Sequence, residues 1–150
     1  MDIQKLLQSL LDHKVCFLVI GGWALPAYGY ERMTKDVDIF IEPTEENALR
    51  TMQALKSVGY DVVNDVDVKV FLTTKVLLRE YILQTDIHPF VAGADFKEAW
   101  EHRMETVIKG IKVFVPSLED YIKMKEAAGR DIDKLDLTVL KEIQRQRNKS

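Results

Sequence analysis

Two segments decide the fold: residues 15–22 read VCFLVIGG and residues 36–41 read DVDIFI. The first begins with a continuous apolar run of strand length, which predicts a buried strand. Its end in Gly21 and Gly22 predicts a sharp turn out of that strand. The second segment alternates acidic and apolar residues and predicts another strand. Between them, residues 23–28 predict a short helix that its proline limits or kinks.

Asp36 and Asp38 are the candidate metal ligands that stand out first. Alternate residues of a strand share a face, so both carboxylates stand on one side while Val37, Ile39 and Ile41 point into the core. Two carboxylates on a largely apolar strand repel each other unless a cation lies between them. Their hard oxygen atoms suit Mg²⁺ or Mn²⁺. The pair alone leaves open the alternative of an edge strand whose acids face solvent.

The turn at Gly21 and Gly22 is a candidate phosphate site. Glycines at the end of a strand leave backbone N–H groups bare and let a phosphate approach closely. A helix beginning at Trp23 adds a favourable potential for an anion. The two features together predict a phosphate cradle beside a metal-ligand pair, as a nucleoside triphosphate requires. A plain turn is the alternative for the glycines taken alone.

The rest of the chain mixes helical and strand patterns without a repeat or a linker, which predicts one domain over residues 1–150. The expected class is α/β or α+β, with a mixed sheet of four or five strands flanked by helices and with C-terminal helices. A strand is expected over 79–90 and a hairpin about Lys109 and Gly110. A last helix is expected to bury Leu135, Val139 or Leu140, and Ile143. The expected helices cover about 3–11, 44–58, 94–102, 117–129 and 132–147, with a short one within 64–75.

Composition is that of a soluble globular protein, with 150 residues, 47% hydrophobic residues and a net charge of −3. This charge argues against broad nucleic-acid binding but not against a local basic surface. The single cysteine, Cys16, is interpreted as a buried strand residue and fits a reducing compartment. The N-terminus has no signal-peptide pattern and no apolar run reaches membrane-spanning length. We therefore expect a cytoplasmic protein without a membrane partner.

The order of an apolar strand, Gly21-Gly22, a gap, and Asp36-Val37-Asp38 resembles the signature of the polymerase-β-like nucleotidyltransferase superfamily. The strings GGWAL at 21–25 and RMTKDVD at 32–38 are similar to the branch with the lincosamide nucleotidyltransferases and the abortive-infection toxins. Residues 118–137, with Leu118-Glu119-Asp120 at their start, are similar to the C-terminal element of toxin-like relatives. The resemblance touches both ends of the chain.

This resemblance implies a third carboxylate from a later strand, and Asp86 matches it, with Glu80 as the alternative. It implies two Mg²⁺ (or Mn²⁺) ions held by Asp36, Asp38 and Asp86. Asp86 is also the expected acceptor of a proton from the attacking hydroxyl. A nucleoside monophosphate then moves from an NTP, such as ATP, to a hydroxyl acceptor, and pyrophosphate leaves.

Several residues are expected to bind the nucleotide or to support the site. Trp23 is expected to pack in the core, although base stacking stays open. His88 shares a strand face with Asp86 and is expected to be structural, or to orient the acceptor. Arg130 is a weaker candidate than Lys125, because an arginine equally suits a helix end. The predicted nucleotide-binding residues are Gly21, Gly22, Arg32, Thr34 and Lys125.

The acceptor is left open among a small hydroxylated antibiotic, a tRNA end and a protein hydroxyl. The chain is short beside antibiotic-modifying enzymes of this branch, which favours a large acceptor, a toxin–antitoxin role, or a homodimer or partner protein that completes the pocket. The alternative of the same fold is a catalytically inactive nucleotide-binding or antitoxin-like protein. Two other enzyme classes, glycosyltransferases and haloacid-dehalogenase-like phosphatases, fit the motif order less well.

Overall fold

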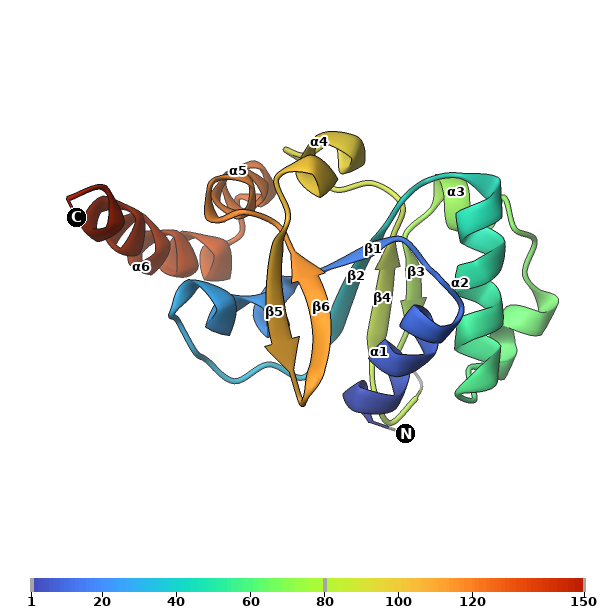
Figure 1. Ribbon diagram of the computed structural model, residues 1–150. Coiled ribbons are helices and arrows are strands. Elements are labelled where there is room, and N and C mark those ends of the chain that lie inside the picture. Colours follow the sequence, from blue (N-terminus) through green and yellow to red (C-terminus); the bar gives the residue numbers. More distant parts are fainter. Residues whose placement is uncertain (1, 80, 150) are drawn as a thin grey trace.

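A central mixed sheet places the acidic residues, and two of its strands form where residues 15–20 and 36–41 predict them (Figure 1). The structure, a computed structural model, describes residues 2–79 and 81–149; the alternative acid Glu80 lies outside them. The elements are α1 (Ile3–Asp12), β1 (Phe17–Ile20), the 3₁₀ helix η1 (Gly21–Tyr28), β2 (Val37–Ile41), α2 (Glu45–Ser57), the 3₁₀ helix η2 (Asp61–Asp65), α3 (Val70–Thr73), β3 (Val76–Leu78), β4 (Thr85–His88), α4 (Phe96–Glu101), β5 (Met104–Ile108), β6 (Ile111–Val115), α5 (Leu118–Ala128) and α6 (Asp131–Asn148).

The main sheet has four strands in the order β1-β2-β4-β3. Strand β2 runs antiparallel to β1 and parallel to β4, and β3 is antiparallel to β4. This arrangement confirms the expected mixed sheet and the α+β class. The predicted hairpin is β5 with β6, which forms a separate two-stranded sheet. Figure 1 shows α5 and α6 on the opposite side of the molecule from α2 and α3.

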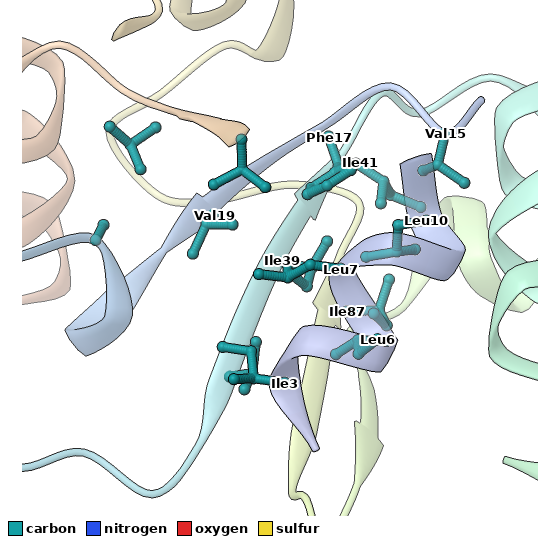
Figure 2. Close-up of a cluster of buried hydrophobic side chains, with 14 of the residues drawn as sticks. Ile3, Leu6, Leu7, Leu10, Val15, Phe17, Val19, Ile39, Ile41 and Ile87 are labelled. Carbon is teal, nitrogen blue, oxygen red and sulfur yellow. The ribbon is translucent and has the colours of Figure 1, made fainter. Parts of the chain in front are cut away.

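One face of the sheet carries the larger hydrophobic core. Val37, Ile39 and Ile41 are fully buried, as the strand alternation predicts. Figure 2 shows side chains of α1, among them Leu6 and Leu7, over this face near Ile39 and Ile87. Burial of each such side chain stabilises the fold by roughly 1.5–3 kcal/mol. The core therefore holds the strands that carry the acids.

The other face of the sheet is covered only in part. Leu18 and Phe40 pack there against Phe96 of α4 and Met124 of α5. Asp38 lies two residues before Phe40 on the same strand, so its carboxylate stands on this face. The larger core thus lies on one side of the sheet, and the acidic residues share the other side with this smaller hydrophobic cluster.

The predicted strand over 79–90 is wrong in extent. The chain makes the short strand β3, reverses direction, and returns as β4. Ile82 lies in the connection between them and is 94% exposed. Residues 81–83 (YIL) are typical of a strand, because they are rich in β-forming side chains. Only the antiparallel pairing of β3 with β4 shows that the chain turns there.

The buried face of α6 also differs from the prediction in part. Leu140 is fully buried as expected, but Leu135 is 65% exposed. The helix instead buries Asp133 and Asp136, which are fully inaccessible to solvent. The spacing of apolar residues along a helix does not predict this face, because acidic residues are buried only where the fold supplies them with charged partners.

No helix within residues 2–79 and 81–149 combines the length and the apolar composition that a membrane span needs.

Candidate active site

Asp38 and Asp86 lie side by side because of the parallel register of β2 and β4. The register pairs Asp38 with Asp86 and Phe40 with His88. Partners at the same level of a parallel pair point to the same face of the sheet. One ligand atom from each of Asp38, Asp86 and His88 lies within 4.8 Å of the others. This acid–histidine cluster has the donor types of a divalent-metal site.

His88 is part of this cluster, whereas the sequence indicated only a structural or acceptor-orienting role. Its Nε2 lies 2.9 Å from Oδ1 of Asp38, and its side chain is 12% exposed. The available signal was the spacing of two between Asp86 and His88, which places both on one strand face. Local spacing does not predict which strand lies next to β4 in the sheet, and therefore does not predict the contact of His88 with Asp38.

Asp36 stands next to the cluster, one residue before β2 begins. Its Oδ2 lies 3.5 Å from Nη1 of Arg79, and its side chain is 35% exposed. Arg79 also donates two hydrogen bonds to Asp86, of 2.9 Å from Nε and 2.7 Å from Nη2. No local sequence pattern indicates Arg79, because the residue follows β3 and contacts the acids only through the β3–β4 pairing.

Gly21 and Gly22 are required for close packing around the acids. Gly21 has φ +68°, and a Cβ on it would lie 2.3 Å from Oδ2 of Asp38. A Cβ on Gly22 would lie 2.6 Å from Cβ of Thr34. The Tyr121 hydroxyl donates a 2.8 Å hydrogen bond to the carbonyl of Gly21. The turn therefore holds the loop before Asp36 close to β1, in addition to any contact with phosphate.

A cavity of about 570 Å³ opens beside these residues. Gly21, Asp36, Asp38, Asp86 and Lys125, all predicted site residues, contribute to its wall. The acidic side chains of the wall come from β4, from α6, and from β2 and the residue before it. Its lysines and arginines come from the loops on either side of β3, from α5 and from the N-cap of α6. The other residues of the wall are Ile20, Lys75, Arg79, His88, Phe90, Val91, Ala92, Tyr121, Met124, Ala128, Arg130 and Asp133. The cavity thus offers both cations for phosphates and carboxylates for a metal.

The two predicted nucleotide-binding residues of the loop make other contacts. Arg32 donates two hydrogen bonds of 2.9 Å to the carboxylate of Asp136 on α6. The hydroxyl of Thr34 donates to the carbonyl of Asp36 at 3.3 Å. Both residues therefore fix the loop that leads to Asp36, and a phosphate contact by Arg32 would require its release from Asp136.

Lys125 lies at the centre of a buried ionic cluster. Its Nζ is 3.1 Å from Asp133 and 3.2 Å from Asp136, and its side chain is 8% exposed. Arg130 pairs with Asp133 at 2.7 Å. Burial alone would raise the pKa of the Asp133 carboxyl, but hydrogen bonds from Arg130 and Lys125 outweigh it and lower the pKa to about 2. The cluster joins the Asp36 loop, α5 and α6.

We expect Asp133 to contribute stability that acid removes. Its folded pKa lies below the ordinary 3.8, so the contribution is complete above about pH 4 and is lost as the pH falls towards 2. Asp133→Asn should lose about 3 kcal/mol of unfolding free energy at neutral pH, because it breaks a buried ion pair. It should also show a shallower pH dependence in that window than the wild type in urea unfolding.

Asp131→Asn is the matched control, because Asp131 lies in the same first turn of α6 with a fully exposed side chain. It should leave unfolding nearly unchanged. Equal pH slopes for wild type and Asp133→Asn would contradict the assignment.

Comparisons with known proteins agree with this geometry. A family model described as "Nucleotidyl transferase of unknown function (DUF2204)" matches residues 1–150. The fold resembles the crystal structure of lincosamide antibiotic adenylyltransferase LnuA with lincomycin bound, with a TM-score of 0.62 and 19% identity. This match covers 95% of the present chain and 98% of that chain. No curated protein matches the sequence at a significant level.

The extent of the structural match corrects one expectation. The antibiotic-modifying enzymes were expected to be longer than this chain, and that difference in length favoured a large acceptor. Because 98% of the LnuA chain is covered, that enzyme carries no large additional domain in its structure. Length therefore gives no reason to prefer a large acceptor.

Proposed function

The chain belongs to the family of nucleotidyl transferases of unknown function, and on that premise we propose that it moves a nucleoside monophosphate from an NTP to a hydroxyl acceptor. The observation that carries the proposal is the pairing of Asp38 with Asp86 beside the Gly21 turn, within one cavity that Lys125 also lines. This arrangement supports a metal centre next to a place for a triphosphate. Pyrophosphate is the expected second product.

The residues present fit a divalent cation. Asp86 is nearly buried, with 3% of its side chain exposed, and it lies close to Asp38. Adjacent carboxylates of this kind require a positive charge between or beside them. We propose that Asp36, Asp38 and Asp86 hold two Mg²⁺ or Mn²⁺ ions, with His88 orienting Asp38 through its hydrogen bond. Bound metal supplies neutralisation of the phosphates and lowers the pKa of the acceptor hydroxyl.

The chain's own groups perform the remaining steps. Asp86 accepts the proton of the attacking hydroxyl, as a carboxylate within reach of the acceptor can. Gly21 allows the triphosphate close to the backbone. Lys125 and Arg130 present positive charge to the phosphates from α5 and the start of α6. Positioning and electrostatic stabilisation carry most of the acceleration in phosphoryl and nucleotidyl transfer.

ATP with a hydroxylated small molecule is the first substrate pair to test. LnuA is a lincosamide antibiotic adenylyltransferase whose structure contains lincomycin, and it shares this fold. Apolar residues of the cavity wall, among them Phe90, Val91 and Met124, offer contact to an acceptor with apolar parts. A tRNA end and a protein hydroxyl remain the other two acceptor classes.

The test is label transfer from nucleoside triphosphates that carry the label at the α- or the γ-phosphate. We expect α-label, and no γ-label, to reach lincomycin, total tRNA or the protein itself in the presence of Mg²⁺. A chelator and the variant Asp86→Asn should each abolish transfer. Transfer of γ-label would instead indicate a kinase-like reaction, and would contradict the proposal.

The second candidate is a nucleotide-binding protein without catalysis. It is favoured by the ion pair between Arg79 and Asp86, which engages one of the proposed metal ligands. Tight triphosphate binding without α-label transfer to any of the three acceptor classes would favour this candidate.

A further inference from the structure

Arg79 makes the most direct contact that any described cation makes with the proposed metal ligands. Its guanidinium forms a two-point contact with Asp86 at 2.9 and 2.7 Å and lies 3.5 Å from Asp36. Its own side chain is 46% exposed, whereas that of Asp86 is 3% exposed. A planar guanidinium matched to both oxygens of a carboxylate is the strongest ion-pair geometry available to a protein. Arg79 therefore neutralises two of the three acids.

The same carboxylates cannot serve Arg79 and a divalent cation equally well. Opposite charges in close contact attract each other appreciably even at the effective dielectric constant of a protein surface, and a doubly charged ion attracts the carboxylates more strongly than a guanidinium does. A cation bound to Asp36 and Asp86 would therefore repel a guanidinium that kept its present contacts. The exposed side chain of Arg79 is free to leave, and the buried Asp86 is not.

We propose that Arg79 is an exchangeable counter-ion of the acidic centre, a step that rests on the proposed function. Arg79 holds Asp36 and Asp86 neutralised before substrate binds, and it releases them to the divalent cation. Its guanidinium then pairs with phosphate oxygens of the triphosphate in the same cavity, where Lys125 and Arg130 add positive charge. The exchange leaves the carboxylates charged and partnered in both states.

Mn²⁺ binding without nucleotide tests the first half of the exchange. We expect Arg79→Gln to bind Mn²⁺ about tenfold more tightly than the wild type in calorimetry or in electron paramagnetic resonance of the free ion. Arg79→Lys retains the charge but loses the two-point contact, so its Mn²⁺ affinity should lie between those of the wild type and Arg79→Gln. Lys75→Gln is the matched control, because it removes one charge from the same cavity wall. Among the described residues Lys75 has no ion pair with the acids, so its effect should be below about threefold.

Thermal unfolding and triphosphate binding test the second half. Without metal, Arg79→Gln should melt below the wild type, because Asp86 loses its partner, and Mn²⁺ should raise its melting temperature by more than that of the wild type. With Mn²⁺ saturating, Arg79→Gln should bind an NTP about tenfold more weakly than the wild type.

The outcomes separate this inference from the proposed function. Mn²⁺ affinity that is unchanged or weaker in Arg79→Gln would overturn the exchange, while α-label transfer by the wild type would still support nucleotidyl transfer. Unchanged NTP affinity in the variant would overturn its phosphate half. Mn²⁺ affinity unchanged in Asp38→Asn, or absence of Mn²⁺ binding by wild type and Arg79→Gln alike, would remove the metal centre and both proposals with it.

Discussion

Replacing Asp38 by Asn is expected to weaken metal-dependent NTP binding by on the order of a hundredfold or more, since it removes a metal ligand and not merely a supporting contact. Asp38 connects three parts of the site. It pairs with Asp86 across the strands, accepts a hydrogen bond from Nε2 of His88 at 2.9 Å, and packs against Gly21. Asn keeps the shape and a hydrogen-bonding oxygen but loses the negative charge.

The fold should survive this change. Removal of one of two neighbouring carboxylates relieves their repulsion, so the free energy of unfolding without metal should be equal to or above that of the wild type. Calorimetric titration of each NTP with and without Mg²⁺ measures the effect and also identifies the nucleotide. Glu105→Gln is the control, because Glu105 is an exposed acid on β5, outside the cavity wall. Equal NTP affinity in Asp38→Asn and wild type would exclude Asp38 as a metal ligand.

Gly21→Ala is expected to weaken the same binding without removing any charge. A methyl group there would lie 2.3 Å from Oδ2 and 3.0 Å from Cγ of Asp38, so the carboxylate or the turn must move. Alanine at φ +68° also adds a backbone penalty of about 1–2 kcal/mol. We expect a loss of NTP affinity comparable to that of Asp38→Asn, together with reduced stability.

Gly110→Ala separates the two causes. Gly110 has a φ of +82°, and no atom lies within 4 Å of the position its Cβ would take. This variant should show the backbone penalty of about 1–2 kcal/mol in urea unfolding and bind NTP normally. Wild-type NTP binding by Gly21→Ala would contradict the argument that this turn must remain bare for Asp38 to keep its place.

Local sequence pattern predicted most of the secondary structure and the class of protein. Apolar runs and glycine turns were sufficient for β1, β2 and the β5–β6 hairpin, because strand length and alternation are local properties. The helix that begins after Ser117 was predicted from its capping residues, and the Ser117 hydroxyl accepts from the amide of Asp120 at 3.1 Å. The resemblance to nucleotidyltransferases, carried by Gly21-Gly22 and Asp36-Val37-Asp38, is confirmed by the family match.

The family match does not test the roles of the individual site residues. Asp36, Asp38, Asp86, Gly21 and Lys125 line one cavity. Their binding of metal and nucleotide stays a prediction that the variants above test. Arg32 and Thr34 make structural contacts, so their predicted contact with phosphate depends on rearrangement.

The sequence by itself determined which residues could carry the chemistry, because it specifies the side-chain types and the spacing of residues along each strand. Only the tertiary structure decided which of them meet. The parallel register of β2 and β4 brought His88 to Asp38, and the reversal after β3 brought Arg79 to Asp86. The packing of α6 against α5 buried Asp133 and Asp136 around Lys125. These contacts join residues of different strands, loops or helices, and their free energy depends on register and burial, which no local pattern specifies.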